Sequence, residues 1–156
     1  MSWDLYLIQF QNGGPAEFDP KASMAVVEKY CVNAVKPPFD PFICKLADGL
    51  ELELWAQGLN GGKPFSGAMI SLRGYTDGTA QFIYDFAKSG DMTILNTGNP
   101  TVLLLDPKQV EQLPVDLREG QRDRTVDVNS AGSLNAALTG SFEAWRKYRD
   151  HVVTGQ

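Results

Sequence analysis

The sequence predicts an α+β fold: an antiparallel or mixed sheet, helices mainly on one of its faces, and a further helix at the C-terminal end. Short apolar or alternating runs indicate the strands. Residues 3–57 and 67–105 each show the order strand, helix, strand, strand, which suggests a pseudo-repeat inside a single domain spanning residues 1–156. Residues 107–153 then form a C-terminal segment that is mainly helical in pattern.

The first strand and helix follow from local pattern. Residues 4–10 alternate between two sides and predict a strand that is buried on at least one face. A helix is expected from Asp19 to about Ala34, because aspartate is a good N-cap and the proline after it is tolerated in the first turn. This helix would contain Cys31. Prolines at 37, 38 and 41 exclude helix over residues 36–41, since proline fixes φ and restricts the residue before it.

A hairpin follows, and its loop decides which side chains share a face. A three-residue loop, Ala47 to Gly49 with Gly49 in the left-handed region, separates apolar from polar residues, whereas a two-residue loop mixes them. The expected apolar pairs are Leu46 with Leu50, Cys44 with Leu52 and Phe42 with Leu54. The opposite face pairs Lys45 with Glu51 and Ile43 with Glu53, with Trp55 two residues further along.

The second segment begins with a strand near residues 68–74. The sequence Thr-Asp-Gly-Thr at 76–79 then opens a helix over residues 80–88, ended by Gly90. Its expected buried stripe consists of Phe82, Ile83, Phe86 and Ala87. Two strands follow at 92–95 and 101–105, separated by a turn at 98–100, and the second has no polar side, which predicts a central strand.

The C-terminal segment combines a short turn, a polar stretch and a long helix. The turn spans residues 107–113, and residues 119–129 form a polar stretch. Residues 118–124 are expected to form a solvated connector, because charges of both signs alternate there. The helix is predicted from about residue 130 or 133 to residue 153. Its broad apolar face contains Leu134, Leu138, Phe142, Trp145, Tyr148 and Val152.

The charge of the chain is asymmetric. Its net charge of −5 comes from residues 1–106, which hold 12 acids and 7 bases, whereas residues 107–156 hold 7 of each. A pI near 4.8 argues against nucleic acid as a partner. It favours a basic protein partner, or else a soluble domain without a charged partner. The N-terminal residues lack the pattern of a signal peptide, and no apolar run is long enough to span a bilayer, so we expect no membrane association and a cytoplasmic location.

Candidate chemical sites are weak. Gly58 to Lys63 is rich in glycine, but its glycine spacing differs from that of a phosphate loop and Pro64 follows the lysine. His151 is the single histidine and lies near the C-terminus, where a catalytic base would be poorly held. The cysteines, Cys31 and Cys44, are expected to be buried, reduced thiols. We therefore predict no catalytic residues, no cofactor and no metal, and a protein that is not an enzyme.

The predicted hairpin supplies the candidate contact surface. Glu51 and Glu53 lie on one strand face about 7 Å apart, because a strand rises ~3.3 Å per residue. Trp55 follows on the same face and Ile43 lies opposite Glu53. Glu51 and Glu53 could lie on an ordinary solvated strand face, but a large outward aromatic residue beside carboxylates is typical of an interface anchor with a charged rim. These four residues are therefore the predicted partner-binding site.

Two short motifs resemble those of small bacterial immunity-type proteins encoded beside polymorphic or contact-delivered toxins. They are Ser-Trp-Asp-Leu-Tyr-Leu at residues 2–7, followed by a helix, and Val-Leu-Leu-Leu at 102–105, followed by Gln109 through Leu113-Pro114. The resemblance implies a stoichiometric inhibitor that binds a toxin domain and occludes it. It transfers no site residues, because immunity surfaces differ with each cognate toxin.

Other functions stay open. The main alternative is a small-molecule-binding domain with a cleft between the two pseudo-repeats. A deep apolar cavity lined by Tyr6, Tyr75 or Tyr84 would favour this alternative. A self-associating structural protein is a further alternative. A flat acidic face would favour a protein partner.

Overall fold

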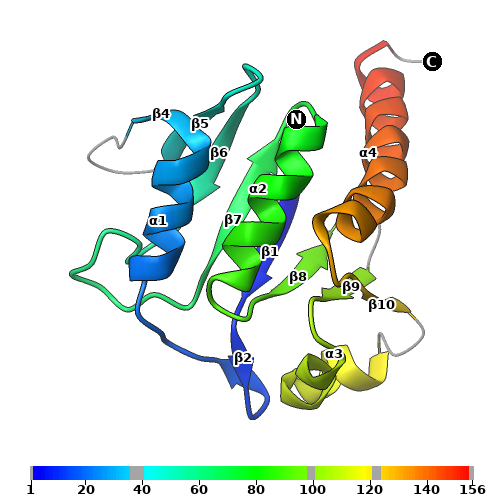
Figure 1. Ribbon diagram of the computed structural model, residues 1–156. Helices are drawn as coiled ribbons and strands as arrows, with labels where there is room; N and C mark the ends of the chain where they lie inside the picture. Colours follow the sequence, from blue (N-terminus) through cyan, green and yellow to red (C-terminus); the bar gives the residue numbers. More distant parts are fainter. Residues whose placement is uncertain (1, 36–40, 98–100, 121–123, 155–156) are drawn as a thin grey trace.

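The computed structural model describes residues 2–35, 41–97, 101–120 and 124–154. It confirms the α+β class: eight strands form one mixed sheet in the order β10-β9-β8-β1-β7-β6-β5-β4 (Figure 1). These strands are β1 (Trp3–Ile8), β4 (Cys31–Val35), β5 (Phe42–Leu46), β6 (Glu51–Trp55), β7 (Gly67–Leu72), β8 (Thr93–Asn96), β9 (Thr101–Leu104) and β10 (Thr125–Asp127). A small separate ladder joins β2 (Phe10–Gln11) to β3 (Gly14–Pro15).

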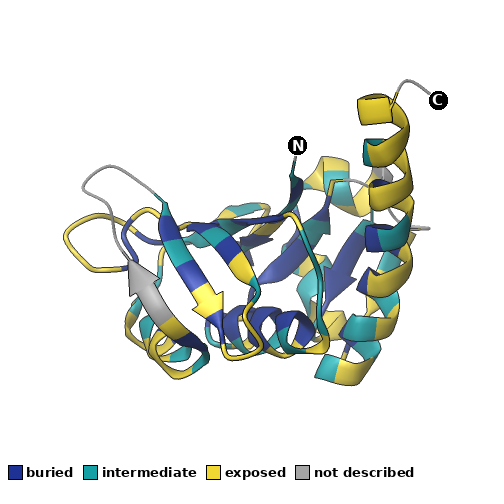
Figure 2. Cartoon of the chain, turned by 90° about the horizontal axis from the view of Figure 1, so that it is seen from above, coloured by how far each residue is buried: buried dark blue, intermediate teal, exposed yellow. Residues whose placement is uncertain are grey.

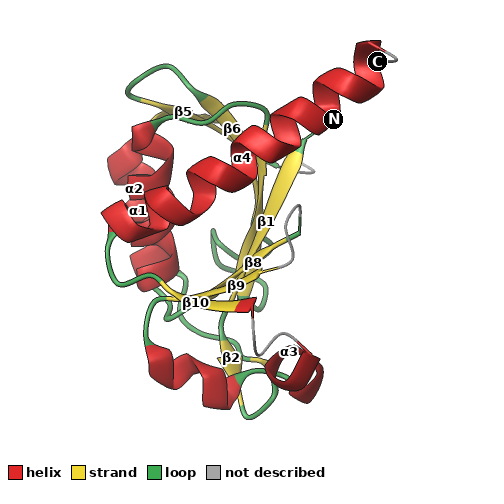
Figure 3. Cartoon of the chain, turned by 90° about the vertical axis from the view of Figure 1, so that its right-hand side faces the viewer, coloured by secondary structure: helices red, strands yellow, loops and turns green. Residues whose placement is uncertain are grey.

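The helices are α1 (Lys21–Tyr30), α2 (Asp77–Lys88), the 3₁₀ helix η1 (Pro107–Gln112), α3 (Val115–Gly120) and α4 (Ala131–Thr154). Figure 3 shows α1, α2 and the start of α4 on one side of the sheet. The predicted break over residues 36–40 and the turn at 98–100 lie outside the described residues.

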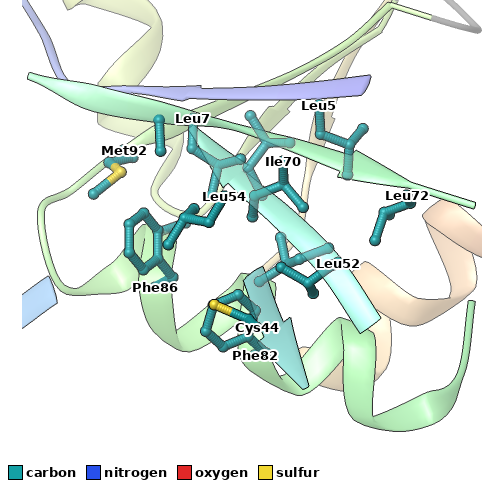
Figure 4. Packing of buried hydrophobic residues seen from close by; sticks show 14 of the residues in the cluster. Leu5, Leu7, Cys44, Leu52, Leu54, Ile70, Leu72, Phe82, Phe86 and Met92 are labelled. Carbon is teal, nitrogen blue, oxygen red and sulfur yellow. The ribbon is translucent and has the colours of Figure 1, made fainter. Parts of the chain in front are cut away.

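The main core lies between this helical layer and the inner face of the sheet. Alternate residues of each strand point inward, because successive side chains in a strand point to opposite faces. Leu5 and Leu7 of β1, Leu54 of β6 and Ile70 of β7 are fully buried against Phe82 and Phe86 of α2 (Figure 4). The predicted stripe of α2 is confirmed, since all four of its residues are buried.

The hairpin register is confirmed. Lys45 pairs with Glu51 and Ile43 pairs with Glu53, and Gly49 has a φ of +92°. A residue with a side chain rarely adopts this φ, so glycine is required at that position of the loop. The side chain of Asp48 closes the turn by accepting from the amide of Leu50 at 3.0 Å.

Strand β1 lies at the middle of the sheet, with β7 and β8 as antiparallel neighbours. β1, from the predicted segment 3–57, therefore lies between two strands of the predicted segment 67–105. Both segments belong to one sheet. β9 is paired on both sides and covered on both faces, as the sequence predicted from its apolar run.

A second, smaller core lies on the outer face of the sheet, at the β8 and β9 end. It consists of Phe10, Val102, Leu104 and Leu113, with Ile8, Leu95, Val110 and Leu117 packed against it. Val110 belongs to η1, Leu117 belongs to α3, and Leu113 lies between these two helices. The other end of the outer face, across β1, β7, β6 and β5, is covered by no described helix.

Helix α4 begins against α2 and then runs past the sheet (Figure 1). Its first half is anchored by Leu134 and Leu138 and by aromatic contacts of Phe142 with Trp3 and Tyr75. The predicted apolar face is wrong at its far end: Tyr148 and Val152 are 61% and 48% exposed, because no described element lies beside the last turns (Figure 2).

Two boundaries predicted from the sequence are wrong. The first helix ends at Tyr30 rather than near Ala34, and Cys31 begins the edge strand β4, which pairs with β5. Part of the polar stretch at residues 119–129 forms β10, which pairs in parallel with β9. Both strands are short and lie at sheet edges, where pairing with a neighbouring strand outweighs weak local propensity.

Candidate protein-binding face

We call the outer face of β1, β7, β6 and β5 the open face. Its side chains lie in rows, because paired residues on adjacent strands stand side by side about 5 Å apart. One row is Tyr6, Met69 and Trp55. The next row is Asp4, Ser71, Glu53 and Ile43.

The first row is aromatic and partly exposed. Tyr6 and Trp55 are each 38% exposed, with the half-buried Met69 between them. Two large aromatic side chains that flank a methionine form a small apolar patch, and aromatic residues and methionine are enriched at protein interfaces. Further apolar surface comes from the half-buried Ile43.

The charged side chains lie on one side of this patch. Arg73, just past β7, forms an ion pair with Glu53, with 3.2 Å between Nη1 and Oε1. Glu51 is exposed and forms no ion pair within the part of the chain that the structure describes, although it pairs with Lys45 across the ladder. With Asp4, the open face carries three acids and two bases, so its charge is weakly negative.

A pocket of about 250 Å³ opens on this face, over β5, β6 and β7. It is lined by Ile43, Glu51, Leu52, Glu53, Ser71 and Arg73. The structure therefore brings Ile43, Glu51 and Glu53 together around one pocket. Trp55 lies on the same face, two residues beyond Glu53.

Neither family models nor curated proteins nor solved structures give a match to this chain. The candidate site therefore depends on its own geometry.

Sequence reasoning missed five residues of this face: Asp4, Tyr6, Met69, Ser71 and Arg73. Each stands beside the predicted hairpin only because β7 pairs with β6 and β1 pairs with β7. The alternation within β7 is a signal that could have found its members, since Ala68, Ile70 and Leu72 form the buried side and Met69, Ser71 and Arg73 the other.

The residues considered for catalysis are not brought together. His151 is exposed in the last turn of α4. Cys31 and Cys44 are free and buried in the main core, as predicted. The neighbouring Cys31 thiol and, to a smaller extent, burial raise the pKa of Cys44, which disfavours its reactive thiolate. Among the described residues, no group of three His, Cys, Asp or Glu side chains could hold a metal ion.

A larger pocket of about 530 Å³ lies at the other end of the outer face, beside β2 and η1. Its lining residues are mostly polar, and two of them already form hydrogen bonds within the protein. Gln109 donates to the carbonyl of Asp91, and Gln112 accepts from the amide of Asn12. None of Tyr6, Tyr75 and Tyr84 lines this pocket or the smaller one. None of the described helices has the length and apolarity that a bilayer span needs.

Proposed function

We propose that this chain is a non-catalytic protein-binding module whose open face docks onto a basic protein partner and occludes it. The observation that carries the proposal is the open face itself: an apolar row of Tyr6, Met69 and Trp55 beside charged residues, on a sheet surface that no described helix covers. Following the sequence resemblance, we propose that the partner is a toxin domain and that binding inhibits it.

The chemistry of the partner follows from charge. All strands of the open face lie within residues 1–106, which hold the whole excess of acids over bases. Opposite charges speed the encounter of two proteins and fix their orientation, whereas large aromatic side chains at the centre supply most of the affinity. Trp55 is therefore the anchor, and Glu51 and Glu53 are the complementary charges.

The arrangement fits occlusion rather than turnover. The face has an ion pair, a free carboxylate and aromatic side chains, but no nucleophile paired with a base among its described residues. A rigid sheet can cover a partner's surface without changing shape, because its side chains are held in a fixed register.

The test is capture of the partner with three forms of the tagged chain at low salt. These are the wild type, the face variant Trp55→Ala/Glu51→Ala/Glu53→Ala, and the control variant Tyr148→Ala/Glu28→Ala/Glu119→Ala. The control removes one exposed aromatic residue and two exposed acids outside the open face. Circular dichroism first verifies that all three are folded.

We expect the wild type and the control to retain one basic protein at near-equal stoichiometry. The face variant should bind it at least about 30-fold more weakly, since a central aromatic hot spot contributes ~2 kcal/mol or more. Adding the wild-type chain to the isolated partner should then abolish the partner's activity. Equal retention by the face variant would contradict the proposal, and so would a retained partner that stays fully active.

The second candidate is a small-molecule site in the larger pocket, whose volume lies in the range typical of ligand pockets. Such pockets are mostly apolar, however, and here Phe10 is the one large apolar side chain among the lining residues. A thermal-shift screen with small metabolites would favour this candidate if a hit were lost on Gln109→Ala but retained by the face variant.

A further inference from the structure

The pocket on the open face contains a buried hydroxyl group that has no hydrogen-bond partner in the described part of the chain. Ser71 is 7% exposed and lines the pocket, and its hydroxyl forms no hydrogen bond with any residue that the structure describes. A buried polar group in a folded protein is normally hydrogen-bonded, because an unmet bond costs about 1–3 kcal/mol. The hydroxyl of Ser71 is thus available to a group that enters from outside.

The lining of the same pocket carries more negative than positive charge. Arg73 uses one carboxylate oxygen of Glu53, which leaves the other oxygen of Glu53 and both oxygens of Glu51 without a cationic partner among the described residues. The lining therefore carries two acids and one base. This balance favours a cation over an anion, since an entering carboxylate would meet two like charges.

The size and walls of the pocket define the shape of this cation. Its volume, about 250 Å³, is below the range of about 300–1,000 Å³ for pockets that hold small molecules. The half-buried Ile43 provides apolar wall beside the polar groups. An apolar stem that ends in a charged head is the form of a long basic side chain.

We propose that this pocket takes a single arginine side chain of the bound protein. Its guanidinium would bond to Glu51, to the free oxygen of Glu53 and to the hydroxyl of Ser71, with its stem along Ile43. Arginine suits the site better than lysine, because its planar head donates five N–H groups and can bond two carboxylates at once. This inference rests on the proposed function and adds a specificity pocket to the open face.

The probe is Nα-acetyl-arginine amide, and the uncharged comparison is Nα-acetyl-citrulline amide, which has nearly the same shape. Titration of ¹⁵N-labelled protein should shift the amide signals of residues 43, 51–53 and 71–73 with arginine, with citrulline at least about tenfold weaker because its head carries no charge. Equal shifts with both probes would overturn the inference, as would arginine shifts spread over the surface or no shifts at all.

Three variants sharpen this test. Glu51→Gln should weaken arginine binding about tenfold by removing a charged acceptor, and Ser71→Val should block it by filling the pocket with a side chain that strands accept. Glu28→Gln removes the same charge from exposed α1 on the opposite side of the sheet and should change nothing. Equal weakening by Glu28→Gln would overturn the inference, because it would show a general charge effect.

The two proposals fail in different ways. If arginine does not bind but partner capture is still lost in Trp55→Ala, the pocket inference is wrong and the open face remains the binding surface. If capture survives in the face variant, the proposed function is wrong whatever the arginine probe does.

Discussion

The outer face of the sheet has two halves. In both, alternate residues of each strand point outward, but the outward side chains differ. At the β8 and β9 end it presents Leu95, Val102 and Leu104, which are packed beneath η1 and its neighbours. Across β7 and β6 it presents Ser71, Glu53 and Trp55, which no described helix covers. Tyr6 of β1 pairs with Leu95 on one side and with Met69 on the other, so it stands at the border between the halves.

The difference shows how one sheet face divides into a covered part and an open part. Where a covering segment is present, Leu95, Val102 and Leu104 are apolar, because burial of a polar group without a partner is costly, and Thr93 is a buried polar residue among them. Where it is absent, charged residues alternate with a few large apolar ones. The open half therefore has the composition of an interface rather than of a core.

The largest expected effect is on stability in the covered half. Leu104→Ala should lower the free energy of unfolding by about 2–5 kcal/mol, because Leu104 is 1% exposed and its loss leaves a cavity. Ile43→Ala in the open half should cost less than about 1 kcal/mol, since this side chain already contacts solvent. Urea unfolding measures both, and equal losses would remove the distinction between the halves.

The next effect concerns the link between the hairpin of the open face and α2. Thr76 and Thr79 form a capping box, and the Thr76 hydroxyl also donates to Asp48 in the hairpin turn. Thr76→Ala should destabilise the protein by about 0.5–2 kcal/mol through the lost cap, as measured by thermal unfolding. Thr76→Ser keeps the hydroxyl and serves as the control, which should stay close to the wild type.

The same link predicts a pH dependence. The bonds from Thr76 and from the amide of Leu50 hold the pKa of Asp48 below its ordinary value of 3.8. A lowered pKa stabilises the fold above that ordinary value, and the contribution is lost as the pH falls through the folded-state pKa. In Thr76→Ala the pKa should move back toward 3.8, as an NMR titration of the Asp48 carboxyl would show. An unchanged pKa would mean that the Thr76 bond is not formed in solution.

The smallest effect is expected from the ion pair of the open face. Arg73→Gln should change the free energy of unfolding by no more than about 1 kcal/mol, and less at high salt, because Arg73 is 67% exposed and surface ion pairs are screened. The same variant should strengthen binding of the arginine probe, since it frees Glu53. A loss of several kcal/mol in urea unfolding would instead assign this pair a structural role.

Much of the open face could be predicted from the sequence. The turn at residues 47–49 sets the hairpin register, and the two-residue period of strands then places Ile43, Glu51, Glu53 and Trp55 on one face. Both signals are local: they depend on glycine geometry and on spacing along one short segment. The apolar stripe of α2 and the existence of α4 follow from helical periodicity in the same way.

Tertiary structure alone decided the rest. The edge strands β4 and β10 form because a neighbouring strand offers hydrogen bonds. Tyr148 is exposed because the last turns of α4 extend beyond the other described elements. Above all, the pairing of β6 with β7 sets Ser71 and Arg73 beside Glu53, although 18 and 20 residues separate them along the chain. The sequence by itself determined which side chains share a strand face, because that is a property of backbone geometry. Strand order depends on the packing of the whole core, so only the folded chain determined which faces meet and where a pocket forms.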